Sequence, residues 1–365
     1  MPSLDLRGPD IEALSQALRK AFPIQRLREL FAFRLDKRLE DYSLGGDYKE
    51  VVFDVIMAAE AEGWTAELVV VARQSNPGNA ALQACAERVH LGASTPTLER
   101  IVKADNPFLD VERFRTRLGR IETQVCRIEI PTPRGTAYGT GFLVAPDVLV
   151  TNHHVMDVVI GGQVRPEAAL FRFDYKRLSN DVVTEGVVFR LAPDDWLVDA
   201  SPPSPVDAER EPKSGVPNPD ELDYAIVRLA DAPGSHPAGD RADPSAPARG
   251  WIDCSRSMPA TPQSPLLIMQ HPSAAPLKLA LDMRAVVGQN ANGTRLTYNV
   301  NTEGGSSGAP CFDANWDLVA LHHSGDPNFD PGHQATYNEG IPIGAILQLL
   351  EARGKRAVLA APAGT

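Results

Sequence analysis

The sequence predicts a chain of two parts: an N-terminal bundle of α-helices, then a larger part of short antiparallel β-strands that ends in a C-terminal helix. Apolar residues recur at spacings of three and four from about residue 9 to residue 89. From residue 125 onward, short β-rich runs separated by turn residues replace that pattern. Near the C-terminus, the stretch IPIGAILQLLEARG again has the composition of a helix.

Residues that stop or start helices divide the first part. Pro23, the pair Gly45 and Gly46, Gly63, and the stretch NPGN at 76–79 separate successive amphipathic stripes. Short helices with short connections favour a compact bundle. This part has no cluster of histidines, cysteines or paired acids, so it offers no obvious chemistry.

The second part begins after a linker, LGASTPT, and one expected lead-in helix, PFLDVERFRTRLGRIETQ. The candidate strands are VCRIEI, GTGFLVA, DVLVTNHHV, ALFRFDY, GVVFRLA, DYAIVRLA, LLIMQHP, RAVVGQ, RLTYNV and LVALHHSG. Short strands of this kind favour an antiparallel sandwich or a pair of barrels. The segment from Asp199 to Asp220 is rich in proline, serine and acids, and we expect an exposed loop there.

Composition and charge exclude several functions. With 43% hydrophobic and 23% charged residues, the chain is typical of a soluble globular protein, and its net charge of -11 argues against a nucleic-acid partner. Neither a secretory signal nor a membrane-spanning apolar run is evident, so we expect a cytoplasmic protein without a membrane partner. The four cysteines lack CxxC spacing, which fits reduced core thiols better than disulfides or a zinc site. We expect no metal or other cofactor.

Three motifs in the β-rich part carry residues for nucleophilic catalysis. His153 and His154 lie at an expected strand end in the stretch VLVTNHHVM. Asp223 lies at the start of another expected strand in ELDYAIVRL, and Ser307 lies in the glycine-rich loop NTEGGSSGAP. A serine hydroxyl is a weak nucleophile unless an imidazole accepts its proton and an acid orients that imidazole. The order His, Asp, Ser is that of chymotrypsin-type proteases.

With these motifs the chain resembles the trypsin-like serine peptidases over about residues 120–352. The resemblance implies the chymotrypsin-like antiparallel double β-barrel, with His154 as general base, Asp223 as orienting acid and Ser307 as nucleophile. It also implies that the backbone N–H groups of Gly305 and Ser307 form the oxyanion hole. We expect His153 to be a neighbour that points the other way.

Two departures separate the chain from the secreted digestive enzymes. Val155 stands where those enzymes have a cysteine, and Ser306 replaces the aspartate that their freed N-terminus binds on activation. The fold must therefore be stable without disulfides, and any control of activity must differ from activation by a freed N-terminus. The chain is more similar to the bacterial glutamyl endopeptidase and HtrA-like branches.

The expected substrate-binding residues are Asn301, Thr302 and His322. Asn301 occupies the position where trypsin-like specificity requires an acid, which disfavours cleavage after Lys or Arg. Thr302 and His322 match the residues that bind a Glu or Gln side chain in glutamyl endopeptidases and in chymotrypsin-like viral cysteine proteases. Two alternatives remain: His322 is equally compatible with a packed core histidine, and Glu303 is close enough to repel an acidic side chain.

The N-terminal part also resembles a known family. Its elements AFP, VVFDVI, AEGW and NPGN are similar to those of the bacterial effector-associated domain, type 1, over residues 4–90. The resemblance implies a death-fold-like module of prokaryotic conflict systems that docks to another protein bearing the same module or to further copies of this chain. The alternative is a structural cap on the second part.

The expected domains are therefore the adaptor bundle at 1–90, a linker and lead-in helix at 91–120, the protease domain at 121–354 and a tail at 355–365. The expected function is that of a serine endopeptidase, acting on a protein or peptide substrate and recruited or activated through the bundle. The alternative is an inert protease-fold scaffold assembled by the helical domain. An intact triad and the glycines beside it weigh against that alternative.

Overall fold

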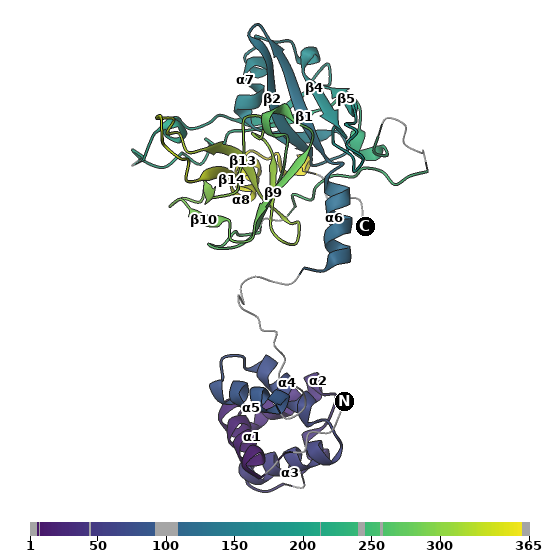
Figure 1. Ribbon diagram of the computed structural model, residues 1–365, viewed down its shortest axis with the longest axis vertical. Coiled ribbons are helices and arrows are strands. Elements are labelled where there is room, and N and C mark those ends of the chain that lie inside the picture. The colour runs from purple at the N-terminus through teal and green to yellow at the C-terminus, as the bar shows by residue number, and fades with distance from the viewer. Residues whose placement is uncertain are drawn as a thin grey trace. The chain divides into compact units, whose positions relative to one another are not determined.

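The computed structural model divides into two compact units, Met1–Val102 and Lys103–Thr365 (Figure 1). It describes Leu6 and residues 8–43, 45–91, 109–211, 213–239, 245–255 and 258–359. In those ranges no helix has both the length and the apolar character needed to cross a membrane.

The described part of the first unit is an all-helical bundle with a core of its own. Its helices are α1 (Gly8–Ala21), α2 (Ile24–Arg34), α3 (Tyr48–Ala61), α4 (Thr65–Ser75) and α5 (Ala80–Leu91). Asp47 caps α3, because its carboxylate accepts the Glu50 N–H while the Glu50 carboxylate accepts the Asp47 N–H. Phe31 and Trp64 pack edge to face in the core, with ring centroids 6.0 Å apart. The breaks between these helices confirm the predicted stops.

The described residues of the second unit form two seven-stranded antiparallel sheets. The first has the order β5-β4-β1-β2-β3-β7-β6, and a bridge between Leu191 and Leu229 also joins the ends of β5 and β7. Its strands are β1 (Val125–Thr132), β2 (Gly135–Leu143), β3 (Val148–Thr151), β4 (Leu170–Phe173), β5 (Val187–Arg190), β6 (Leu197–Ser201) and β7 (Tyr224–Arg228).

The second sheet has the order β10-β11-β14-β13-β12-β8-β9. Its strands are β8 (Leu266–Gln270), β9 (Lys278–Asp282), β10 (Val286–Gln289), β11 (Leu296–Tyr298), β12 (Pro310–Phe312), β13 (Leu318–Gly325) and β14 (Asn338–Pro342). One core cluster contains residues from both sheets, among them Phe142, Tyr224 and Leu321, so the sheets pack on each other. The site described below forms where their strands end.

Three helices complete this unit. α6 (Val111–Ile121) is the predicted lead-in helix, and its Phe114 packs on Trp316, with ring centroids 5.1 Å apart. α7 (His153–Ile160) follows β3, and α8 (Ile343–Ala352) is the predicted C-terminal helix. α8 buries Ile346 and Leu350 against the core that the two sheets share.

The prediction of an exposed loop from Asp199 to Asp220 is wrong for part of that segment. β6 extends through Ser201, and a 3-10 helix spans Pro205–Ala208, with Asp207 buried. Proline and acidic residues are typical of solvated loops, but here Asp199 and Asp207 are buried against cations from distant segments. β9, β12 and β14 were also not predicted: β9 has no buried residue, β12 has three residues, and β14 contains glycine and proline.

Candidate active site

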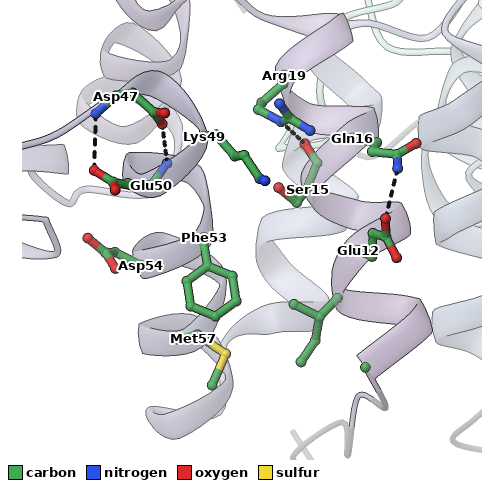
Figure 2. Close-up of a pocket in the computed structure, with 12 residues that line it drawn as sticks. Glu12, Ser15, Gln16, Arg19, Asp47, Lys49, Glu50, Phe53, Asp54 and Met57 are labelled. Carbon is green, nitrogen blue, oxygen red and sulfur yellow. Dashed lines mark hydrogen bonds between the residues drawn. The ribbon is translucent and has the colours of Figure 1, made fainter.

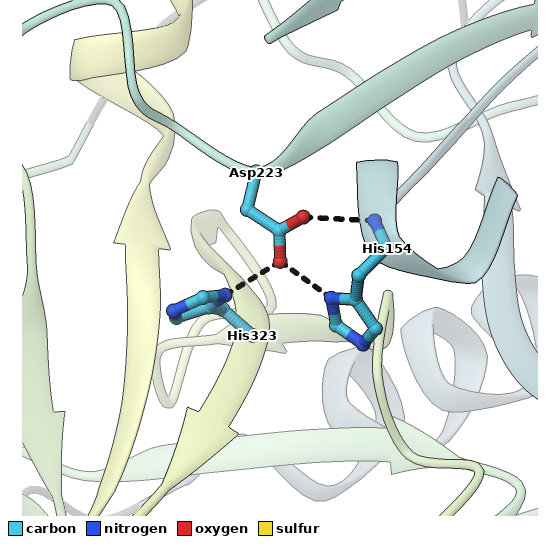
Figure 3. A group of neighbouring side chains, drawn as sticks. All are labelled: His154, Asp223 and His323. Carbon is cyan, nitrogen blue, oxygen red and sulfur yellow. Dashed lines mark hydrogen bonds and ion pairs between the residues drawn. The ribbon is translucent and has the colours of Figure 1, made fainter. Parts of the chain in front are cut away.

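His154 and Asp223 meet where β3 ends and β7 begins (Figure 3). Nδ1 of His154 lies 2.6 Å from Oδ2 of Asp223, and the backbone N–H of His154 donates to Oδ1 at 2.9 Å. The carboxylate therefore fixes both the backbone and the ring of His154. In this orientation Nδ1–H faces the carboxylate, so Nε2 is the nitrogen left to act as a base.

The two histidines do not lie at a strand end, as the sequence predicted, but open α7. β3 stops at Thr151, and the side chain of Asn152 then donates to the backbone oxygen of Asp223 at 2.9 Å. The backbone N–H of His153 donates to the same oxygen at 3.2 Å. These two bonds turn the chain into the helix and bring His154 to the carboxylate.

Asp223 is fully buried and ionised. Burial by itself would raise the pKa of this carboxyl group, but the hydrogen bonds and charges of His154 and His323 outweigh burial and hold the pKa well below its usual range. The side chain of His154, in contrast, is 39% exposed. A buried carboxylate behind a solvent-accessible imidazole is the arrangement that a general base requires.

The loop that carries Ser307 is tied to both sheets. The carbonyl of Ser307 accepts from the backbone N–H of Thr140 in β2 at 2.8 Å, and the N–H of Gly308 donates to the carbonyl of His322 in β13 at 2.9 Å. Gly308 has a φ of +87°, and a Cβ there would lie 2.1 Å from the Thr140 oxygen, so only glycine fits. No hydrogen bond joins the Ser307 hydroxyl to His154 in the described residues, and such bonds often tighten only when substrate binds.

The backbone N–H groups of Gly305 and Ser307 have no hydrogen-bond partner within the described ranges. The preceding carbonyl, that of Gly304, accepts from the N–H of Ser273 at 2.6 Å. Because the C=O and N–H of a trans peptide point in opposite directions, this bond aims the N–H of Gly305 away from Ser273. The carbonyl of Gly305 is held in turn by the hydroxyl of Thr140 at 2.8 Å. Two donors of the kind that stabilise an oxyanion are therefore available.

Two family models match parts of this chain. The family model of the trypsin-like peptidase domain matches residues 139–321, which is half of the chain. The chain belongs to the trypsin-like peptidases. A second family model, effector-associated domain 1, matches residues 4–90.

A relative and two solved structures are similar to this chain at 13–33% identity. The uncharacterized protein y4fB of Sinorhizobium fredii is 33% identical over 214 residues, which cover 56% of this chain and 28% of that protein. The chain thus spans under a third of that relative's length. The Rv3671c protease of M. tuberculosis is 17% identical, with 73% of this chain and 97% of that chain covered and a TM-score of 0.40. The Yersinia pestis serine endoprotease is 13% identical, with 67% and 66% covered and a TM-score of 0.42.

The residues predicted to bind the substrate side chain lie in the loop that carries Ser307 and in the neighbouring strand β13. Asn301 is exposed, and its carbonyl accepts from the Gln270 side chain at 3.0 Å; Thr302 is half-buried. His322 is buried in β13, where its Nδ1 lies 2.6 Å from the Tyr298 hydroxyl. Burial, together with the neighbouring His323 and His154, lowers the pKa of His322 to about 3, so the ring is neutral.

Sequence reasoning missed a second group of residues at this site, of which Ser273 acts through its backbone N–H. They are Thr140, Asp207, Ser273, Arg295 and His323. The adjacent pair His322 and His323 was the one available signal, because neighbouring residues in a strand face opposite sides of the sheet. Asp207 had no signal, since its segment reads as a solvated loop.

Proposed function

We propose that this protein is a serine endopeptidase that hydrolyses peptide bonds through His154, Asp223 and Ser307. The observation that carries the proposal is the hydrogen-bonded pair of His154 and the buried, ionised Asp223. Trypsin-like family membership and the unpaired N–H groups of Gly305 and Ser307 support it.

The proposed mechanism assigns one role to each group. Nε2 of His154 takes the proton of the Ser307 hydroxyl as Oγ attacks the scissile carbonyl carbon, and Asp223 stabilises the imidazolium. The N–H groups of Gly305 and Ser307 donate to the developing oxyanion. His154 then gives its proton to the leaving amine, and a water molecule, deprotonated by the same ring, hydrolyses the acyl-enzyme.

A fluorophosphonate probe tests this proposal without knowledge of the substrate, because it reacts only with an activated serine. We expect the full chain to be labelled at Ser307 and the label to disappear in Ser307→Ala. Ser235→Ala is the matched control, because Ser235 is exposed on a different turn and should leave labelling unchanged. A folded wild-type chain that takes no label would instead favour the inert scaffold.

We propose a preference for an amide side chain, as in Gln, at the residue before the scissile bond. His322 is neutral and so supplies no cation for a carboxylate, whereas a neutral ring can hydrogen-bond an amide. Glu303 adds a carboxylate beside the loop, held by the Ser273 hydroxyl at 2.7 Å. Peptides that differ only at this residue test the preference, and preferred cleavage after Arg or Glu would contradict it.

We propose that the helical unit is an adaptor, which docks to another protein with an effector-associated domain or to a second copy, in bacterial defence signalling. The family match supports docking. A groove of about 860 Å³ between α1 and α3 gives a surface for it (Figure 2). Ile11 lines the groove together with the half-exposed Phe53 and Met57, while charged residues such as Glu12 and Lys49 surround these apolar groups. We also propose a cytoplasmic location, which fits four buried cysteines that form no disulfide.

Tethering through an adaptor raises the effective concentration of protease near its target to the millimolar range. Deletion of residues 1–90 should therefore preserve probe labelling but abolish processing of the natural target. In the full chain, Phe53→Asp should have the same effect, with Phe329→Asp as a control, because Phe329 is 88% exposed in the other unit. Unchanged processing in both variants would refute the adaptor role.

A further inference from the structure

Asp223 binds two imidazoles through a single oxygen. Its Oδ2 lies 2.6 Å from Nδ1 of His154 and also 2.6 Å from Nδ1 of His323 (Figure 3). His323 lies in β13 with 4% of its side chain exposed, and its ring centroid is 6.3 Å from that of His154. The carboxylate is therefore held from the interior by a second histidine, on the side opposite the candidate base.

His323 lies between two carboxylates. Its Nε2 is 3.3 Å from Oδ2 of Asp207, which is an ion-pair distance, although the angle does not make a well-directed hydrogen bond. Arg295 binds the same Asp207 through Nε at 2.8 Å and through a terminal nitrogen at 2.6 Å. The five groups thus form a row in which carboxylates alternate with imidazole or guanidinium groups. The order is His154, Asp223, His323, Asp207 and Arg295.

Charge balance in this row favours a protonated His323. A neutral ring with Nδ1–H towards Asp223 would turn the lone pair of Nε2 towards the carboxylate of Asp207, which is repulsive. Burial disfavours the charged ring, but Asp207 and Asp223 outweigh burial and raise the pKa of His323 to about 8. The protonated ring and Arg295 then balance the two carboxylates.

The other titratable groups near His323 do not reverse this balance. His322 belongs to the same strand and is neutral. Glu339, in the adjacent strand β14, is paired with Lys213 at 3.0 Å. Glu221 hydrogen-bonds to Ser204, on the segment that carries Asp207.

We propose that His323 is a positioning residue for the hydrolysis: an imidazolium between Asp223 and Asp207 that anchors the carboxylate behind His154 and offsets part of its negative charge. This inference rests on the proposed function. Anchoring restricts the carboxylate to the orientation that binds both the ring and the backbone N–H of His154. The positive charge of His323 offsets part of the attraction by which Asp223 would stabilise a protonated His154 ring.

Replacement of His323 by asparagine, a neutral hydrogen-bond donor, tests whether the charge of His323 offsets that of Asp223. At an effective dielectric constant of about 20, a unit charge about 6 Å away shifts a titration by about one to two pH units. In His323→Asn, the acid limb of the pH profile of fluorophosphonate labelling should move upward by that amount. Labelling should then be about 10- to 100-fold slower at pH 6 and much closer to wild type at pH 8. His333→Asn is the matched control, because His333 pairs with Asp326 in the same way on an exposed loop.

A purely structural role would lower the labelling rate by the same factor at every pH, and that result would overturn the proposal. Should His323→Asn fail to fold, nitrogen-15 NMR of the histidine rings decides the question in the full chain. We expect His323 to carry both ring protons at pH 7; a neutral ring at that pH would overturn the proposal. The same spectrum of the Ser307→Ala chain separates this inference from hydrolysis, because the charge of His323 does not depend on whether Ser307 reacts.

Discussion

Replacement of Gly305 by alanine tests whether the loop geometry matters for the reaction. Gly305 has a φ of +94°, and a Cβ there would lie 2.7 Å from the backbone oxygen of His271 and 3.2 Å from the nitrogen of Ala274. These atoms cannot easily move away, because the N–H of His271 is bonded to the Thr140 hydroxyl at 3.1 Å. The backbone strain alone costs about 1–3 kcal/mol. The peptide before residue 305 must therefore rotate, and its N–H leaves the proposed oxyanion site.

Loss of one such donor slows turnover by about 100- to 1000-fold. The strain should also lower Tm by roughly 2–10 °C in a unit of this size. The assay is the second-order rate of fluorophosphonate labelling, measured alongside thermal unfolding. Gly304→Ala is the matched control, because a Cβ at Gly304 meets no atom within 4 Å and its φ is not positive. If Gly305→Ala were labelled within about threefold of Gly304→Ala, the proposed role of this N–H group would be refuted.

Three further predictions concern the supporting side chains. Thr140→Val removes the hydroxyl that binds Gly305, so we expect about 1–3 kcal/mol lower unfolding free energy in urea and about tenfold slower labelling. Arg295→Met removes the guanidinium of the buried Arg295–Asp207 pair and should lower the unfolding free energy by about 3–5 kcal/mol, and by less when combined with Asp207→Asn in a double-mutant cycle. The pKa of His323 is raised to about 8, so protonation of this ring contributes its full stabilisation of the fold below about pH 6.5. As the pH rises through 8, the free energy of unfolding should fall by up to about 2 kcal/mol. The free energy of unfolding, measured in urea at pH 6 and at pH 9, should differ less between the two pH values in His323→Asn than in wild type.

Much of the fold could be predicted because local signals agree with the tertiary structure. Pro23 and Gly63 interrupt the helical pattern where helices end, and long apolar runs such as Leu266–Gln270 are buried strands. The missed strands lack such signals. β12 has three residues, and β14 reads NEGIP, so its place in the sheet depends on pairing with β13 rather than on propensity.

The residues of the candidate site also divide into those that a local motif predicts and those that it does not. His154, Asp223 and Ser307 lie in recognisable motifs, and the structure brings His154 and Asp223 together. Asp207 and Arg295 are 88 residues apart in the chain, and their contact depends on the way the two sheets pack. A single sequence holds no local pattern for that contact.

The bond from the Ser273 N–H to the Gly304 carbonyl has a consequence for control. Ser273 has a φ of +49°, and this bend presents its N–H to the Gly304 carbonyl. Under the proposed function, the orientation of one oxyanion donor therefore depends on the 3-10 turn Pro272–Ala274, which lies outside the loop that carries Ser307. A ligand or partner that shifts this turn would alter catalysis without contacting His154, Asp223 or Ser307.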